Sequence, residues 1–230
     1  MTEKQISARL EMIRRELSEA SEGRYPAPRI IAVTKTHSAE EILPLRNAGI
    51  TEIGENRVQE LKGKLPGLGD AFRVHLIGRL QRNKVRQIIG DVCMIQSVDS
   101  LPLAEEISRR AEAADTVMPV LVQVSPAGEI QKGGAAPGEI RSLLRAVGGM
   151  DGIRVKGLMA VMPDTDDEVL LDRLFSEMRT LFDALREEAI PGTDMEELSM
   201  GMSGDYRLAA RHGATMVRIG SAIFGPRIYT

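Results

Sequence analysis

A lysine and two serine-glycine segments are the parts of the chain whose residue types suggest chemistry. Lys35 directly follows the apolar run at residues 30–34, and an amine that is partly removed from water can form a Schiff base with a carbonyl. Residues 199–205 (SMGMSGD) and 218–225 (RIGSAIFG) each join serine and glycine after an apolar run. Backbone amides and serine hydroxyls at such junctions donate hydrogen bonds to phosphate. These residue types indicate a ligand with both a carbonyl and a phosphate, such as pyridoxal phosphate or a sugar phosphate.

Each of these features also has a simpler interpretation. Lys35 could be a surface lysine whose stem lies along the end of a strand. Ser203 could cap the helix that follows it, with the glycines serving the turns. Asn56, which follows another apolar run, could equally be a helix N-cap. His75 lies beside apolar residues, so we interpret it as a histidine of the barrel interior rather than as a metal ligand.

The elements that would position these residues alternate along the chain. Eight apolar runs of strand length occur at residues 30–34, 50–53, 74–77, 92–98, 118–124, 155–161, 198–202 and 216–219. Patterns of helical period separate them. One such helix is opened by Ser38 and Glu41 and ended by Gly49, and a longer one is opened by Thr165 and Glu168. About 25 residues per unit suits a closed barrel of parallel strands.

We therefore predict an α/β fold, a single (β/α)8 TIM-type barrel over residues 29–230, preceded by a helix and lead-in over residues 1–28. Thr2 and Gln5 have the spacing of a capping box at the start of that helix. A doubly wound dinucleotide-binding sheet is not supported, because Gly67 and Gly69 lack the third glycine of its fingerprint. The active site of a parallel barrel lies at the carboxyl ends of its strands, where Lys35 would lie.

Composition and charge exclude several classes of protein. The chain has 230 residues, of which 43% are hydrophobic and 27% charged, as in a globular protein of one large domain. A net charge of −3 and only 3% aromatic residues argue against nucleic acid as a partner. The basic run of Arg79, Arg82, Lys84 and Arg86 is interpreted as a solvated helix face.

Membrane and metal sites are not predicted either. No apolar stretch approaches the roughly 20 residues of a membrane span, and the amino terminus lacks a signal-peptide core, so we expect a cytoplasmic protein. Cys93 is the single cysteine, which cannot build a cysteine-based zinc site. His37 and Glu40 have helical spacing but no third ligand, so no metal site is expected.

Together, these segments resemble the pyridoxal phosphate homeostasis protein family, also called the YggS or PROSC family, which is related to the barrel domain of alanine racemase. The resemblance spans nearly the whole chain and rests on five ordered segments, at residues 32–36, 54–60, 75–84, 199–203 and 217–225. It implies a barrel of PLP fold type III without the carboxyl-terminal β domain of the racemases. The implied cofactor is pyridoxal 5′-phosphate (PLP).

The resemblance implies that Lys35 forms the internal aldimine with PLP and that Arg218 faces the pyridine nitrogen. An arginine is always protonated, so it would keep that nitrogen unprotonated and weaken the cofactor as an electron sink. The chain departs from the family at Val74, where an aromatic residue is common, and at Gln123, where asparagine is common.

The other implied site residues surround the phosphate and the ring. Ser203, Gly220 and Ser221 would hold the phosphate, and Ser221 replaces a common threonine. Asn56 would lie near the ring and its Schiff base. Lys132 matches a family lysine proposed as a secondary attachment point for PLP, and a solvated loop lysine is the alternative interpretation.

The leading hypothesis is a binding protein that holds PLP reversibly on Lys35 and acts in PLP homeostasis without substrate turnover. PLP-requiring apoenzymes would be its partners. We expect a monomer, because five residues after Gly225 leave no room for the dimer-forming β domain of the racemases. The first alternative is a small PLP-dependent amino-acid racemase or lyase, for which Tyr206 is a candidate weak acid. The second is a sugar-phosphate isomerase or aldolase in which Lys35 binds a keto sugar directly.

Overall fold

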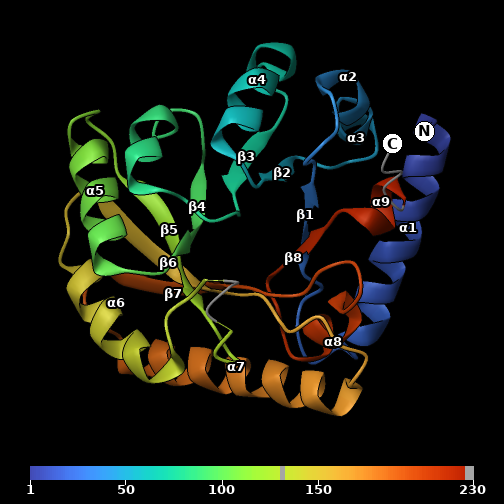
Figure 1. Ribbon diagram of the computed structural model, residues 1–230. Coiled ribbons are helices and arrows are strands. Elements are labelled where there is room, and N and C mark those ends of the chain that lie inside the picture. The colour runs from blue at the N-terminus through green and yellow to red at the C-terminus, as the bar shows by residue number, and fades with distance from the viewer. Residues whose placement is uncertain (130–132, 226–230) are drawn as a thin grey trace.

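The predicted (β/α)8 barrel is confirmed by the computed structural model, which describes residues 1–129 and 133–225. Within these residues, eight parallel strands close into a barrel in chain order. The strands are β1 (Arg29–Val33), β2 (Glu52–Glu55), β3 (Arg73–Leu76), β4 (Met94–Val98), β5 (Met118–Val124), β6 (Ile153–Ala160), β7 (Thr193–Ser199) and β8 (Met216–Ile219). Figure 1 shows the helices arranged around the strands, with the long α7 running beneath the barrel in that view.

The helices follow the strands, with α1 preceding the first strand. Their bounds are α1 (Glu3–Ala20), α2 (Ala39–Ile42), α3 (Pro44–Asn47), α4 (Val58–Leu68), α5 (Leu101–Glu112), α6 (Ile140–Gly148), α7 (Glu168–Glu188), α8 (Tyr206–Arg211) and α9 (Ser221–Phe224), with the 3₁₀ helices η1 (Arg82–Gln87) and η3 (Pro137–Glu139). Within the two described ranges, no helix is both long enough and apolar enough to cross a membrane.

The predicted capping boxes at Thr2 and Ser38 are both present, but two helix predictions needed correction. The helix opened by Ser38 ends at Ile42, and a second short helix begins at Pro44, because proline suits the first turn of a helix and not its interior. The N-cap of α7 is Asp167, not Thr165, because the Asp167 carboxylate accepts the amide of Leu170.

The predicted seventh strand at residues 198–202 was also wrong in its position. The strand β7 begins at Thr193 and ends at Ser199, so the apolar run covers only its last residues. The first part of β7 is polar because Asp194 pairs with Arg154 and Lys156 of the neighbouring β6. Cross-strand ion pairs can replace apolar contacts at the rim of a sheet, and such a segment leaves no hydrophobic signature in the sequence.

Two separate apolar clusters lie on the two sides of the sheet. The larger one fills the space between the strands and the outer helices, and includes Leu10, Phe175 and Phe182, each at most 1% exposed. The smaller cluster is formed by Ile31, Met94, Leu121, Met159 and Met216, with Cys93 and Val161 packed against it. The interior of the barrel therefore holds only a short apolar layer, and polar side chains occupy the rest.

The pairing of β1 decides which loops surround Lys35. Ala32 of β1 is in register with Ile53 of β2 on one side and with Ile219 of β8 on the other. Because the strands are parallel, the loops that follow β2 and β8 leave the barrel beside the loop that carries Lys35. The register thus places Asn56 on one side of Lys35 and the Gly220 loop on the other.

Candidate functional site

Lys35 lies at the carboxyl end of β1, in a loop with an unusual backbone. It lines a small cavity together with Gly220 and Ser221 from the loop after β8. The next residue, Thr36, has a φ of +70°, which is uncommon for a residue other than glycine. The loops of β1 and β8 therefore bring an amine and two of the predicted phosphate-binding residues to the same place.

Ser203 ties the loop after β7 to the loop after β8. Its Oγ accepts hydrogen bonds from the backbone amides of Gly220 and Ala222, both at 3.2 Å. The interpretation of Ser203 as a helix N-cap is wrong, because Asp205 occupies that position before α8. Two amides thus converge on one oxygen, which is the arrangement that a phosphate oxygen requires.

Arg218 is fully enclosed in the barrel interior, with 4% of its surface exposed. Its Nη1 donates to Ser199 Oγ at 2.7 Å, and its Nη2 donates to the carbonyl oxygen of Ala160 at 2.7 Å. Burial lowers the pKa of Arg218 to about 10, while the negative charge of Asp205 opposes this change. The guanidinium therefore stays protonated at neutral pH and is held by two neighbouring strands.

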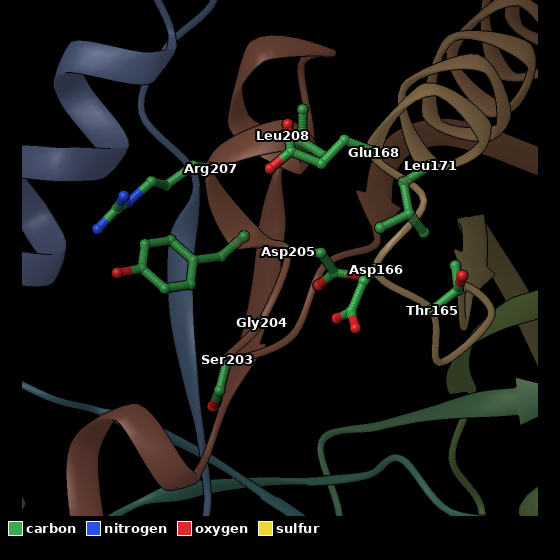
Figure 2. Close-up of a pocket in the computed structure, with 10 residues that line it drawn as sticks. Thr165, Asp166, Glu168, Leu171, Ser203, Gly204, Asp205, Arg207 and Leu208 are labelled. Atoms are coloured by element: carbon green, nitrogen blue, oxygen red, sulfur yellow. The ribbon is translucent and has the colours of Figure 1, made fainter.

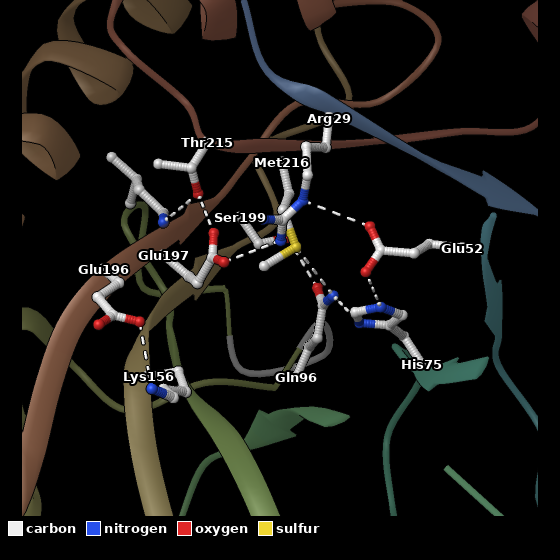
Figure 3. Close-up of polar contacts among 11 residues, drawn as sticks. Arg29, Glu52, His75, Gln96, Lys156, Glu196, Glu197, Ser199, Thr215 and Met216 are labelled. Atoms are coloured by element: carbon white, nitrogen blue, oxygen red, sulfur yellow. Dashed lines mark hydrogen bonds and ion pairs between the residues drawn. The ribbon is translucent and has the colours of Figure 1, made fainter. Parts of the chain in front are cut away.

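From Ser199 a chain of polar contacts runs through Gln96 and His75 to Glu52 (Figure 3). Ser199 Oγ donates to Gln96 Oε1 at 2.7 Å, and Gln96 Nε2 lies 3.0 Å from His75 Nδ1. His75 Nε2 in turn lies 3.5 Å from a carboxylate oxygen of Glu52. Burial alone would lower the pKa of His75, but the neighbouring Cys93 and the carboxylate of Glu52 raise it to about 9.

His75 is thus an interior histidine, as predicted, with 1% of its surface exposed. Across residues 1–129 and 133–225, no group of three or more histidine, cysteine or acidic side chains is arranged to hold a metal ion. Sequence reasoning did not single out Gln96, whose side chain links His75 to Ser199. Its position within the apolar run at residues 92–98 is the feature of the sequence that could have indicated a buried polar contact.

A second polar cluster lies behind the Lys35 loop. The Nζ atom of Lys64, on α4, donates to the carbonyl oxygen of Thr34 at 2.7 Å, to Glu55 Oε1 at 2.7 Å and to Glu60 Oε1 at 2.6 Å. Glu60 also accepts the backbone amide of Thr36, and Glu55 accepts the hydroxyl of Thr34. The residues on both sides of Lys35 are therefore held by one buried cluster.

The two carboxyl groups of this cluster differ in their pKa. Burial raises the pKa of Glu55, although the hydrogen bonds from Lys64 and Thr34 act in the opposite direction. Burial also opposes ionisation of Glu60, but hydrogen bonds from Lys64 and the Thr36 amide lower its pKa overall. Glu60 therefore ionises at a lower pH than Glu55 does.

Asn56 lies at the end of β2 and is not a helix N-cap, because Arg57 occupies that position before α4. The side-chain oxygen of Asn56 is buried and makes no hydrogen bond within the described part of the chain. Its backbone is pressed against Gly78 after β3, where an added Cβ would lie 2.3 Å from the Asn56 carbonyl oxygen. An amide oxygen held rigidly without a partner at the barrel mouth is suited to accept a hydrogen bond from a ligand.

A neighbouring pocket of about 460 Å³ lies between the segment before α7 and the segment that leads into α8 (Figure 2). Asp166, Glu168 and Asp205 line it together with Ser203. These carboxylates would repel a phosphate group. The cavity that Lys35 lines with Gly220 and Ser221 is a separate one, and Ser203 Oγ contacts its loop through the Gly220 amide.

Tyr206 is held by the N-terminal helix. Its hydroxyl donates a hydrogen bond to Glu16 of α1, and its ring is buried. Burial and the hydrogen bond with Glu16 raise the pKa of Tyr206. Lys132, the predicted secondary attachment point, lies outside the described residues.

Comparisons with known proteins agree on one family. The family of alanine racemase N-terminal domains matches residues 8–227. The chain is 37% identical to the pyridoxal phosphate homeostasis protein of Aquifex aeolicus over 225 residues, which are 97% of each chain. It is also 37% identical to the protein of the same name from Pseudomonas aeruginosa, covering 94% of this chain and 91% of that one.

A solved structure of a relative has the same fold as this chain. PipY of Synechococcus elongatus, in the structure described as having PLP bound, superimposes with a TM-score of 0.84 at 34% identity, covering 96% of this chain and all of PipY. Similarity at this level and over this length goes beyond a shared barrel fold. The chain therefore belongs to the pyridoxal phosphate homeostasis proteins, within the family of alanine racemase N-terminal domains.

Proposed function

We propose that the protein binds PLP as a Schiff base on Lys35 and takes part in PLP homeostasis. The observation that carries this proposal is the cavity that Lys35 shares with Gly220 and Ser221. A ligand that has both a carbonyl and a phosphate group needs an amine for the carbonyl and amide donors for the phosphate in the same place. The PLP-bound structure of PipY, a relative that is 34% identical, supports the proposal.

The residues proposed to surround the cofactor carry groups that suit the phosphate and the ring of PLP. Ser203, Ser221 and the amide of Gly220 would donate hydrogen bonds to the phosphate. In the structure the amides of Gly220 and Ala222 already converge on a single oxygen, that of Ser203. The unpartnered side-chain oxygen of Asn56, within the described residues, would accept a hydrogen bond at the edge of the ring.

Arg218 supports a role in binding rather than in turnover. When bound, PLP supplies an electrophilic ring that can stabilise a carbanion, and it does so best when its pyridine nitrogen is protonated. The buried guanidinium of Arg218 keeps its own proton at neutral pH, since its pKa is about 10. Facing that nitrogen, it would donate a hydrogen bond and hold the nitrogen unprotonated, so we propose that the protein has no substrate turnover of its own.

The absorption spectrum of the purified protein tests the attachment. A Schiff-base band should form with PLP, borohydride should fix the cofactor to the chain, and peptide mapping should find it on Lys35. Lys35→Ala should lack the band, while Lys62→Ala, which changes an exposed lysine of α4, should keep it. Mapping would also show whether Lys132 carries PLP in addition. If no band formed in the wild-type protein with PLP in excess, the proposed function would be overturned.

A racemase or lyase that uses the same Schiff base remains the alternative. Such an enzyme needs a second acid or base, and the Tyr206 hydroxyl is engaged with Glu16 of α1 instead. Chiral chromatography of alanine, serine and other amino acids incubated with the holoprotein decides between the two. Steady turnover that disappears in Lys35→Ala would establish the enzyme and overturn the carrier proposal.

We also propose that PLP-requiring apoenzymes receive the cofactor and that the protein acts as a cytoplasmic monomer. The name of its relatives, which denotes homeostasis of PLP, supports the transfer of PLP to apoenzymes. Mixing holoprotein with a purified PLP-dependent apoenzyme should restore that enzyme's activity faster than the spontaneous loss of PLP allows. Sedimentation of the holoprotein should give a single species near the monomer mass of 25.2 kDa.

A further inference from the structure

A broad groove lies beside Asn56 at the mouth of the barrel. It has a volume of about 940 Å³ and follows the loops after β2, β3 and β4. Asn56 is one of the residues that line it, so the groove adjoins the proposed cofactor site. The residues that give it its charge are Arg57, Arg79, Arg82, Lys84 and Asp99.

The groove is strongly basic although the whole chain has a net charge of −3. Among the described residues, four cationic side chains and a single carboxylate line it. Arg57 lies close enough to Glu60 to help lower the pKa of that carboxyl group. The side chains of Arg79, Arg82 and Lys84 make no ion pair or hydrogen bond within residues 1–129 and 133–225. Their charges are therefore available to a ligand.

The walls of the groove are fixed to the cofactor site. The loop after β3 is in backbone contact with Asn56 at Gly78, and the carbonyl oxygen of Gly78 accepts the hydroxyl of Ser97 at 2.7 Å. The 3₁₀ helix η1 is anchored by Val85, which is completely buried. The backbone that carries the cations is therefore held at a defined position relative to Asn56.

The basic run of the sequence is divided by this geometry. Arg82 and Lys84 line the groove, whereas Arg86, on the same 3₁₀ helix, is not among the described residues that do so. On a solvated helix face, as predicted from the sequence, these side chains would all be exposed to solvent in the same way. The structure instead gathers part of the run, with Arg57 from the loop after β2, around one opening.

We propose that this basic groove is the access route for the phosphate-bearing cofactor, which it attracts and guides between solvent and Lys35. The proposal rests on the proposed function, and it adds a route and a set of residues to it. The ligand class is an organic phosphate, which is multiply anionic at neutral pH. Clefts lined by charge of one sign raise association rates by about 10-fold to 1,000-fold, and the effect weakens as salt is added. Charges at the rim of a site change mainly the association rate and its salt dependence.

Stopped-flow measurement of Schiff-base formation tests this route. The double variant Arg79→Gln/Arg82→Gln removes two charges from the groove. The matched control Arg73→Gln/Arg86→Gln removes two charges from the same stretch of chain but outside the groove. We expect the groove variant to bind PLP at least five-fold more slowly than the control at low ionic strength, with the difference lost at high ionic strength. Pyridoxal, which has no phosphate, should react equally with both variants.

The outcomes separate this inference from the proposed function. If wild-type protein formed no Schiff base at all, the proposed function would fail first. If it did, but the groove variant and the control bound PLP at the same rate, the access route would be overturned alone. It would also be overturned if the groove variant slowed pyridoxal as much as PLP, because the defect would then be one of structure rather than of charge. Thermal unfolding of both variants checks that each is folded.

Discussion

The side-chain nitrogen of Lys64 donates a 2.7 Å hydrogen bond to the carbonyl oxygen of Thr34, the residue directly before Lys35. Lys64 also pairs with Glu60, which accepts the amide of Thr36, the residue directly after Lys35. The peptide groups on both sides of the proposed Schiff-base lysine are thus held by Lys64 and by the carboxylate of Glu60 with which it pairs. Thr36 keeps its uncommon positive φ because this cluster holds it.

Replacement of this cation should affect both stability and cofactor binding. Lys64→Met leaves two carboxyl groups, those of Glu55 and Glu60, without their partner, and breaking a buried pair in this way costs about 3–5 kcal/mol. Urea unfolding should show that loss, and the folded variant should hold a smaller fraction of PLP as a Schiff base at limiting PLP. Lys62→Met is the matched control. Lys62 lies on the exposed side of the same helix, α4, and pairs with Asp91, which lies outside that helix. This substitution should cost at most about 1 kcal/mol. Equal effects of the two variants would contradict a special role for Lys64.

Loss of the Arg218 guanidinium should weaken PLP binding more than folding. Arg218→Met removes the hydrogen bonds to Ser199 and to the Ala160 carbonyl, but it also removes a buried charge, so the two effects on folding partly cancel. A charged hydrogen bond to the ring nitrogen is worth about 1.5–3 kcal/mol, which corresponds to about a 10-fold to 100-fold weaker Kd for PLP. Fluorescence titration with PLP measures the Kd. An unchanged Kd would show that Arg218 does not face the cofactor.

The Ser203 hydroxyl should discriminate between phosphorylated and unphosphorylated ligands. Ser203→Ala removes an oxygen that the amides of Gly220 and Ala222 now share, and it removes a donor for the phosphate. We expect the Kd for PLP to rise about 10-fold, as for the loss of one hydrogen bond, with no change for pyridoxal. Ser142→Ala, at an exposed serine of α6 that bonds to the Glu139 carbonyl, is the control and should change neither Kd.

Stability should fall as the pH rises from about 6.5 to 9 because of His75. Burial lowers the pKa of His75, but Cys93 and Glu52 raise it to about 9, above the value of about 6.5 in the unfolded chain. The folded protein therefore binds a proton more tightly than the unfolded chain in this window. The stabilisation is complete below pH 6.5 and lost above pH 9, and it amounts to something on the order of 3 kcal/mol.

The slope of the unfolding free energy against pH reveals this contribution separately from any structural damage. His75→Asn should flatten the slope between pH 6.5 and 9, whatever its effect on overall stability. His212→Asn is the control, because His212 pairs with Asp172 outside the barrel interior. If the slope of the His75 variant equalled that of the wild type, His75 would not be the group that titrates.

The barrel and the caps at Thr2 and Ser38 were predictable from local patterns, and features that depend on tertiary contacts were not. The alternating runs predicted the barrel, and the spacing of Thr2 and Gln5 predicted a cap that the structure contains. The start of β7 was missed because it is polar, and Asp194 pairs there with charged side chains of the adjacent strand β6. Asn56 resembles an N-cap locally, but α4 begins one residue later and Arg57 occupies that position.

The burial of Lys64 has a signal in the sequence. The buried residues of α4 are Val58, Leu61, Lys64 and Leu68, a spacing of three and four that places a lysine in the apolar stripe. A lysine in such a stripe needs buried acceptors, and Glu60 is one turn before it. What the sequence cannot supply is the identity of the third acceptor, the Thr34 carbonyl, because that contact joins two different units of the barrel.

The polar column inside the barrel has a consequence for how the protein can change over evolutionary time. The main apolar cluster lies outside the sheet, between the strands and the helices, and the inner one is a single short layer. Substitutions that alter Arg218, Ser199, Gln96 or His75 therefore act on a side of the sheet that contributes little of the hydrophobic stabilisation. The barrel can acquire or lose chemistry on its inner face while the outer face keeps most of its apolar packing.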